Sequence, residues 1–252
     1  MIKVKNIYEF IDSFAPFDTA EDWDNVGILV GDKNAEVTKA LLALDITNDV
    51  VEEAHDKGAQ AIISHHPIIF GGIKHVLSDS AVYRAAKYDI SCICAHTNLD
   101  RSTVFGVNTE LAKACGLTNV KFCEESEIMF AGELECSVRA DEFAKMIKSN
   151  LGMSGLVFTN CGKQIKKAAV SSGAGGSEIF SAVRLGADAF ITGEIKHHEL
   201  VFANEAGISV YVLGHYQSEN VVIKPLCEKL AAEFPDTEFV VSETFSDNIS
   251  FI

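Results

Sequence analysis

No stretch of this 252-residue sequence approaches the roughly 18 consecutive apolar residues that a helix needs to cross a bilayer, so we expect no transmembrane helix. The start of the chain breaks its apolar positions with charge and has no small-residue cleavage site, which argues against a signal peptide. Basic residues are scarce: 21 Lys and Arg stand against 36 Asp and Glu, a net charge of −15. Because Lys and Arg provide most of the affinity for phosphate backbones and anionic lipids, this balance disfavours nucleic-acid and membrane partners.

The cysteines lack any pattern that indicates disulfides or a metal cluster. There are seven, an odd number, and no two form a Cys-x-x-Cys motif. Apart from Cys92 and Cys94, which lie on one predicted strand, they are scattered along the chain. We therefore expect reduced, mostly buried thiols and a cytoplasmic protein.

Apolar runs alternate with segments of helical periodicity along the chain. The first helix is expected around residues 7–14, and strands are expected at 40–46, 60–64 and 90–95, with a helix after each strand. Strands that alternate with helices predict crossover connections and mostly parallel sheets buried on both faces. The fold class is therefore α/β.

The second half of the sequence repeats the pattern of the first. Three segments have counterparts in the same order: residues 39–42 with 167–170, 58–64 with 186–192, and 90–96 with 208–215. The first two pairs share one offset, since 167 − 39 = 128 and 186 − 58 = 128. Short apolar strands can match by chance, but three ordered matches favour an internal duplication. We expect one domain from residues 1–126, with 215–252 packing back onto it, and a second from 127–214.

Side chains that suit metal ligation follow four predicted strands. They are His65 and His66, His96 and Asp100, His197 and His198, and His215 and Glu219. The carboxyl ends of parallel strands converge on one edge of a sheet, where ligands bind. Positions 65, 100 and 219 are therefore candidates for one pocket, although they are far apart in the sequence.

The candidate ligands are imidazoles and carboxylates, which zinc, iron and manganese accept. They are His65, His66, Asp100, His215 and Glu219. His215 and Glu219 are four residues apart and share one face if a helix begins there. Either carboxylate could bridge two ions, and paired ions would hold an attacking and a leaving oxygen.

Several of these residues have competing interpretations. His96 could be a ligand, a hydrogen-bond donor to a carboxylate, or a general acid/base. A His-His pair by itself is more often part of a turn or a helix cap than a pair of metal ligands. For His197 and His198 we favour a solvated start of a helix. His55 and His75 are expected at the surface, and Trp23 in the core or anchoring a loop.

A glycine-rich segment, residues 171–177 (SSGAGGS), lies between a predicted strand and a helix. Backbone amides at such a position could hold a phosphate. The segment is neither a Walker A loop nor a Gly-x-Gly-x-x-Gly fingerprint, so a tight turn is at least as good an interpretation.

Six motifs together resemble the NIF-three-like family, whose members are commonly named GTP cyclohydrolase 1 type 2 homologs. They are residues 23–32 (WDNVGILVGD), 64–67 (SHHP), 96–100 (HTNLD), 173–176 (GAGG), 192–198 (TGEIKHH) and 214–219 (GHYQSE). The resemblance covers nearly the whole chain in order, and the length matches the short form of the family, without the domain that some members carry between the halves.

The resemblance implies two similar, intertwined α/β/α domains of three layers, and a ring-shaped homohexamer with metal pairs facing the central cavity. It also implies two divalent cations per chain (zinc, iron or manganese). The ligands that it implies are His65, His66, Asp100, His215 and Glu219. Asp100 or Glu219 would bridge the two ions, and His96 would stand close to them.

The sequence thus predicts a metal-dependent hydrolase that acts on a nucleotide or another small molecule. The family name implies ring opening of GTP to dihydroneopterin triphosphate and formate. An activated water would attack the substrate while His96 shuttles protons, with Lys196 or Arg101 contacting phosphates. The alternative is a non-catalytic metal-binding scaffold or regulatory protein, because fold and ligands do not fix a substrate.

Overall fold

The computed structural model describes residues 1–124 and 126–250, and the chain divides into two compact units. Unit 1 comprises Met1–Leu99 and Ile223–Ser246, and unit 2 comprises Asp100–Val222 with the segment that begins at Asp247. The sequence-based division at residues 126/127 and 214/215 differs from this one. Residues 100–124 go with unit 2 because side chains such as Leu111 and Cys115 pack into its core.

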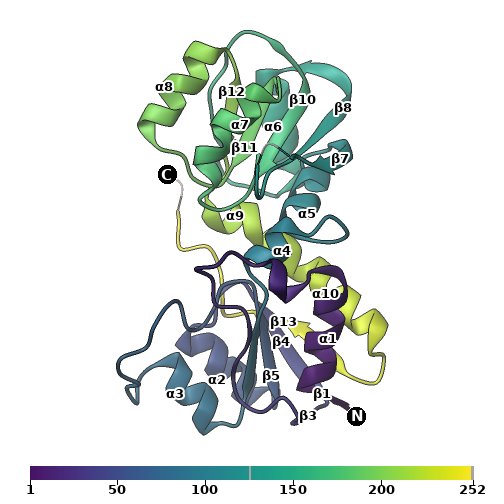
Figure 1. Cartoon of the computed structure of the whole chain (residues 1–252), viewed down its shortest axis with the longest axis vertical. Coiled ribbons are helices and arrows are strands. Elements are labelled where there is room, and N and C mark those ends of the chain that lie inside the picture. Colours follow the sequence, from purple (N-terminus) through teal and green to yellow (C-terminus); the bar gives the residue numbers. More distant parts are fainter. Residues whose placement is uncertain (125, 251–252) are drawn as a thin grey trace. The chain divides into compact units, whose positions relative to one another are not determined.

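Helices alternate with strands in unit 1 (Figure 1). Its elements are, in chain order, β1 (Ile2–Lys3), α1 (Val4–Phe14), η1 (Phe17–Thr19), β2 (Gly27–Val30), β3 (Glu36–Val37), β4 (Lys39–Ala43), α2 (Asn48–Asp56), β5 (Ala61–Ser64), α3 (Ala81–Lys87), β6 (Ser91–Cys94), α10 (Ile223–Glu233) and β13 (Glu238–Val241). The helix predicted around 7–14 and the three strands predicted at 40–46, 60–64 and 90–95 are all present, so this part of the α/β prediction is confirmed.

The main sheet of unit 1 has the strand order β13-β4-β5-β6-β2. The neighbours from β13 to β6 pair in parallel, and β2 runs antiparallel to β6. Leu41 and Ile62 pack against Val50 and Ala54 of α2, whose first turn is capped by Thr47. Figure 1 shows α2 and α3 on one face of this sheet and α1 and α10 on the other. The sheet is therefore buried on both faces, and its parallel strands end together.

Unit 2 is also mixed α/β. Its elements are, in chain order, α5 (Val107–Ala114), β7 (Thr118–Phe122), β8 (Phe130–Arg139), α6 (Ala140–Asn150), β9 (Val157–Phe158), β10 (Gln164–Ser171), η2 (Gly175–Glu178), α7 (Ile179–Arg184), β11 (Ala189–Thr192), α8 (His197–Ala206), β12 (Ser209–Val212), α9 (His215–Glu219) and η3 (Asn220–Val222). The short helix α4 (Thr97–Arg101) contains the boundary between the units.

The prediction of mostly parallel strands is wrong for the sheet of unit 2. Its order is β7-β8-β10-β11-β12-β9, and only β10, β11 and β12 pair in parallel. The other three pairings are antiparallel. Between β7 and β8 the chain has residues 123–129, too short for the dozen or more residues of a parallel crossover. The prediction holds for unit 1 and is wrong for unit 2.

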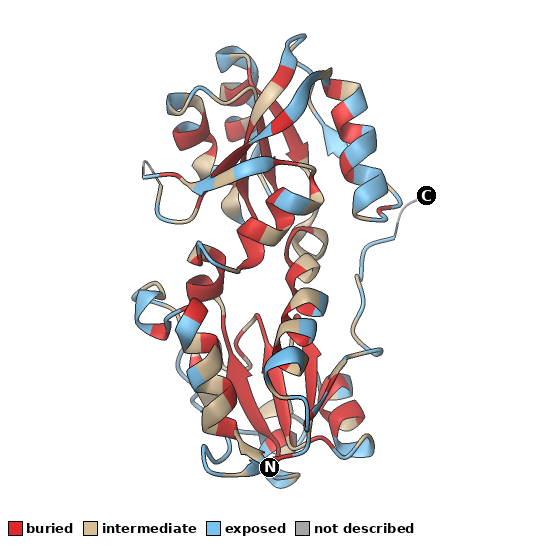
Figure 2. Ribbon diagram, turned by 90° about the vertical axis from the view of Figure 1, so that its right-hand side faces the viewer, coloured by how far each residue is buried: buried red, intermediate tan, exposed pale blue. Residues whose placement is uncertain are grey.

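Adjacent residues on the central strands of unit 2 face two different hydrophobic clusters. Ala168 and Val170 pack with Phe143 of α6, whereas Ala169 packs with Ile179 of α7. Figure 2 shows these strands coloured as buried, with exposed positions on the outer faces of the helices. The period-2 alternation of strand side chains therefore buries both faces under helices.

The matched sequence segments occupy equivalent positions in the two sheets. In unit 1, Ala40 pairs with Ala61, and in unit 2, Ala168 pairs with Ala189, so both residues of the pair are shifted by 128.

All seven cysteines are free and five of them are buried, as predicted. Across the part of the chain that the structure describes, no helix combines the length and the apolar character needed to span a membrane.

Candidate metal centre

Three histidines of unit 1 converge where two parallel strands end. His65 and His66 follow β5 directly, and His96 lies two residues beyond β6. One ring nitrogen of each lies within 4.8 Å of one ring nitrogen of each of the others. The ring centroids are 5.1 to 5.5 Å apart. The common register of β5 and β6 thus brings together side chains that are about thirty positions apart in the sequence.

Each of these rings has its Nδ1 atom hydrogen-bonded to an oxygen. Nδ1 of His65 is 3.0 Å from the carbonyl oxygen of Ala95, and Nδ1 of His66 is 2.8 Å from Oδ1 of Asp45. Nδ1 of His96 is 2.9 Å from Oδ1 of Asp24. Because carbonyl and carboxylate oxygens accept, each Nδ1 donates, and in the neutral ring Nε2 is the atom that could bind a cation. This is the arrangement by which proteins orient metal-ligating histidines.

Asp24 is itself held firmly. The backbone amide of Thr97 donates to Oδ2 of Asp24 over 3.0 Å, and the Thr97 hydroxyl donates to the same oxygen over 2.6 Å. Burial raises the pKa of the Asp24 carboxyl, but the hydrogen bonds from His96 and Thr97 outweigh that effect and bring the pKa down to about 2. Asp24 is therefore ionised at neutral pH and fixes the His96 ring. Neither Asp24 nor Asp45 was predicted; the signal for Asp24 was its place in the motif at residues 23–32.

Asp45→Asn is expected to weaken metal binding by about 10- to 100-fold, the usual effect of removing an outer hydrogen-bond partner of a ligand. An amide at this position loses the negative charge that favours the Nδ1–H form of His66. Competition with a chelating dye measures the affinity. Asp22→Asn is the matched control, because Asp22 is an exposed carboxylate of the same unit. Equal affinities in both variants would exclude this role for Asp45.

In unit 2, His215 and Glu219 are the first and last residues of α9. Nε2 of His215 lies 3.1 Å from Oε2 of Glu219, so the two share a helix face. Nδ1 of His215 is 2.8 Å from Oε1 of Glu194, which repeats the pattern of the unit 1 histidines. Glu194 is a further acid that the sequence analysis missed. The Glu219 carboxylate is buried, whereas the His215 ring is partly exposed.

The glycine-rich segment at residues 171–177 supports the predicted acidic ligands of unit 2. The amide of Gly173 donates to Oγ of Ser218 over 3.0 Å, and the Ser172 hydroxyl lies 3.4 Å from Oδ1 of Asp100. Gly173 has φ +56°, and a Cβ there would collide with Oε1 of Glu219. The Gly173 amide is thus engaged within the protein, which favours the tight turn over a phosphate loop at this residue.

Other predicted residues lie elsewhere. His197 and His198 are exposed in the first turn of α8, and no metal-ligand group among residues 1–124 and 126–250 includes them. His55 is exposed and stacks on Tyr88, with the ring centroids 4.0 Å apart. Trp23 was expected in the core or anchoring a loop, and its exposure of 61% excludes the core. The Trp23 ring contacts His96 and is not buried in the core.

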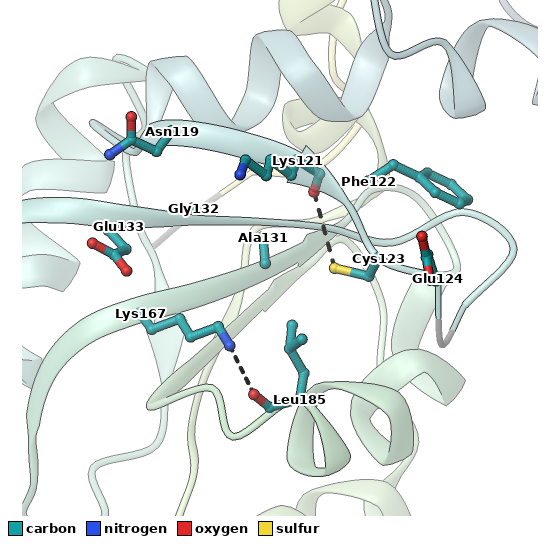
Figure 3. Close-up of a pocket in the computed structure, with 10 residues that line it drawn as sticks. All are labelled: Asn119, Lys121, Phe122, Cys123, Glu124, Ala131, Gly132, Glu133, Lys167 and Leu185. Atoms are coloured by element: carbon teal, nitrogen blue, oxygen red, sulfur yellow. Dashed lines mark hydrogen bonds between the residues drawn. The ribbon is translucent and has the colours of Figure 1, made fainter.

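A separate pocket of about 550 Å³ lies over β7 and β8 of unit 2 (Figure 3). Glu124 and Glu133 line it together with Lys121 and Lys167, so its charges offset one another. Nζ of Lys167 donates to the carbonyl oxygen of Leu185 over 2.8 Å. No predicted site residue is among those that line the pocket, and we assign no role to it.

The donor chemistry of both units fits a divalent cation. Unit 1 offers three imidazole Nε2 atoms with fixed orientation, and unit 2 offers an imidazole with a buried carboxylate. Nitrogen and carboxylate oxygen donors suit zinc, iron and manganese. A bound cation would also offset the negative charge of the clustered acids.

The sequence matches one family model over nearly its full length. The model is described as Duf34/NIF3 (NGG1p interacting factor 3) and matches residues 2–249. A protein of Clostridium perfringens named GTP cyclohydrolase 1 type 2 homolog is 34% identical over 263 residues, and the match covers 100% of both chains. A Campylobacter jejuni protein of the same name is 33% identical, over 91% of this chain and 92% of the relative.

Solved structures show the same architecture. The crystal structure of a hypothetical protein from Staphylococcus aureus matches with a TM-score of 0.92 and 31% identity, and the match covers 99% of both chains. Reduced HcgD from Methanocaldococcus jannaschii matches with a TM-score of 0.82 and 29% identity, over 96% of this chain and 98% of that chain.

Proposed function

The chain belongs to the Duf34/NIF3 (NGG1p interacting factor 3) family, and we propose that it is a divalent-metal-dependent hydrolase. One observation carries the proposal. His65, His66, His96 and His215 all have Nδ1 bonded to an oxygen acceptor, so that coordination or proton transfer would take place at Nε2, which in His215 faces the Glu219 carboxylate. Structural histidines have no common reason to adopt this orientation four times at the ends of parallel strands.

In this proposal each chain binds two divalent cations, zinc, iron or manganese. The proposed ligands are His65, His66, Asp100, His215 and Glu219. Asp100 and Glu219 would supply the carboxylate ligands. When bound, the cations supply a water that is activated at neutral pH and positive charge that stabilises the transition state. Asp45 and Glu194 orient His66 and His215 through their Nδ1 atoms.

His96 is the proposed proton-transfer residue. Its Nδ1–H donates to the ionised Asp24, so the ring exchanges protons at Nε2. The bond to Asp24 also holds the ring in one orientation while Nε2 exchanges a proton. In the alternative assignment His96 is a third imidazole ligand in unit 1 and uses the same Nε2 atom. Substitution of His96 distinguishes the two roles, because loss of a ligand reduces metal content and loss of a proton-transfer residue does not.

The proposed substrate is a nucleotide, and the name of the relatives favours GTP. In that reaction one water adds to C8 of the purine and opens the imidazole ring to a formamide. A second water hydrolyses the formamide and releases C8 as formate, and the ribose then rearranges and closes the pterin ring with loss of one water. With a net charge of −15, the protein depends on bound cations to offset the charge of a nucleotide. A cytoplasmic location, a homohexameric assembly and an origin of the two units by duplication complete the proposal.

Incubation of metal-loaded protein with GTP and other nucleotides tests the proposal. Mass spectrometry is expected to find formate and dihydroneopterin triphosphate from GTP, or a hydrolysis product of another nucleotide, and no product from chelator-treated protein. Tight metal retention without turnover of any nucleotide would contradict the hydrolase and favour a non-catalytic metal-binding scaffold.

A further inference from the structure

Two exposed aromatic rings flank His96 in unit 1. Trp23 is 61% exposed and Phe70 is 71% exposed. The ring centroid of Trp23 lies 6.0 Å from that of His96, and the centroid of Phe70 lies 6.3 Å from it. The two aromatic rings are 6.0 Å from each other. Single exposed apolar residues are normal, but two large rings against one histidine of a candidate metal centre form a defined surface.

Hydrogen bonds hold the two rings in place. The side-chain amide of Asn25 donates to the carbonyl oxygen of Ile69 over 2.8 Å, which links the two segments that carry Trp23 and Phe70. Asp24, the neighbour of Trp23, is fixed by His96 and Thr97. The contact between Asp24 and His96 therefore also positions the segment that carries Trp23, and the bond from Asn25 ties the segment that carries Phe70 to it, although both rings stay open to solvent.

We propose that Trp23 and Phe70 form a stacking platform for the planar heteroaromatic ring of the substrate. This inference rests on the proposed function and specifies its substrate class as a nucleotide or a related heterocycle. The chain is strongly acidic, so phosphate groups gain little affinity from the protein itself. Stacking on aromatic side chains supplies affinity that depends on the base and needs no positive charge.

A protein partner or a second copy of the chain would use this surface differently. The segment after Phe70 exposes three aliphatic side chains, Ile73, Val76 and Leu77, with Leu77 62% exposed. A protein interface draws its affinity from a broad apolar area, so it would include these residues. A single planar ring stacks on aromatic faces alone. Leu77→Ala therefore separates the two kinds of occupant.

Fluorescence tests the platform directly, because Trp23 is the only tryptophan in the sequence. The full chain is titrated with GTP, guanosine and ribose 5-triphosphate, with and without added metal. We expect GTP and guanosine to quench the emission with saturation and ribose 5-triphosphate, which lacks a base, to leave it unchanged. Phe70→Ala is expected to weaken GTP binding about tenfold or more. Leu77→Ala is the matched control and should bind GTP like the unchanged protein.

Equal quenching by ribose 5-triphosphate would overturn the platform, and so would an unchanged GTP affinity of Phe70→Ala. A lower mass in sedimentation for both Phe70→Ala and Leu77→Ala would also overturn it, because that result identifies an interface between copies of the chain.

The platform and the hydrolase can fail separately. Quenching by guanosine without turnover supports the platform and contradicts the hydrolase. Turnover with an unchanged KM in Phe70→Ala supports the hydrolase and contradicts the platform.

Discussion

His66→Ala is expected to lower metal-dependent turnover by about 10³-fold, because a bound cation stabilises transition-state charge by several kcal/mol and each 1.4 kcal/mol is a factor of ten in rate. Removal of the ring also leaves Asp45 without its Nδ1–H donor. The metal content of the purified variant should fall in parallel, as measured by elemental analysis. His75→Ala is the control, since His75 is an exposed histidine of the same unit.

Glu219→Gln makes the same comparison in unit 2. The amide keeps the size of the side chain but removes the charge beside Nε2 of His215. Metal content and turnover should again fall together, while Glu205→Gln, a change at an exposed position on α8, should leave both unchanged. Full turnover in either ligand variant would contradict the ligand assignment, and reduced metal content in a control variant would mean that the measurement reports general instability.

Gly173→Ala is expected to weaken metal binding by about 100-fold or more, at the upper end of what outer interactions of a metal site contribute. A Cβ at residue 173 would collide with Oε1 of Glu219 and lies close to Cε1 of His215. The carboxylate must move to make room, since the Gly173 amide is also tied to Ser218. Competition with a chelating dye measures the change.

Gly152→Ala is the matched control for this substitution. Gly152 has φ +63°, close to the +56° of Gly173, but a Cβ there would meet nothing within 4 Å. Both variants should lose about 1–2 kcal/mol of stability from the left-handed backbone, as measured by denaturant unfolding. Only Gly173→Ala should lose metal. Similar metal affinity in both variants would show that the contact with Glu219 does not matter for binding.

The strands that position the histidines could be predicted because they are buried on both faces. Residues 61–64 and 91–94 are continuous apolar or small runs, which identify a strand without any alternation. β8 was missed because the charged side chains Glu133, Glu135 and Arg139 interrupt it and most of its second half is exposed. β8 pairs with the preceding strand β7 and with β10, and the pairing with β10 joins distant segments that no local pattern connects.

The candidate ligands were visible in the sequence, but the acids that orient them were not. His215 and Glu219 have helical spacing, which is a local property. Asp24 and His96 are 72 positions apart, and Glu194 and His215 are 21 apart. Only the tertiary structure selects these acids from the 36 in the chain. For Trp23 the sequence left two expectations open, a place in the core or an anchor of a loop, and only the exposed position in the structure excludes the core.

The metal content of the purified chain tests the central claim most directly. Elemental analysis after gel filtration, with and without reconstitution by zinc, iron(II) or manganese, counts the cations that each chain retains. We predict two equivalents per chain in the unchanged protein, and fewer in both His66→Ala and Glu219→Gln. No retained metal after reconstitution, or the same content in the two ligand variants as in the unchanged protein, would contradict the account.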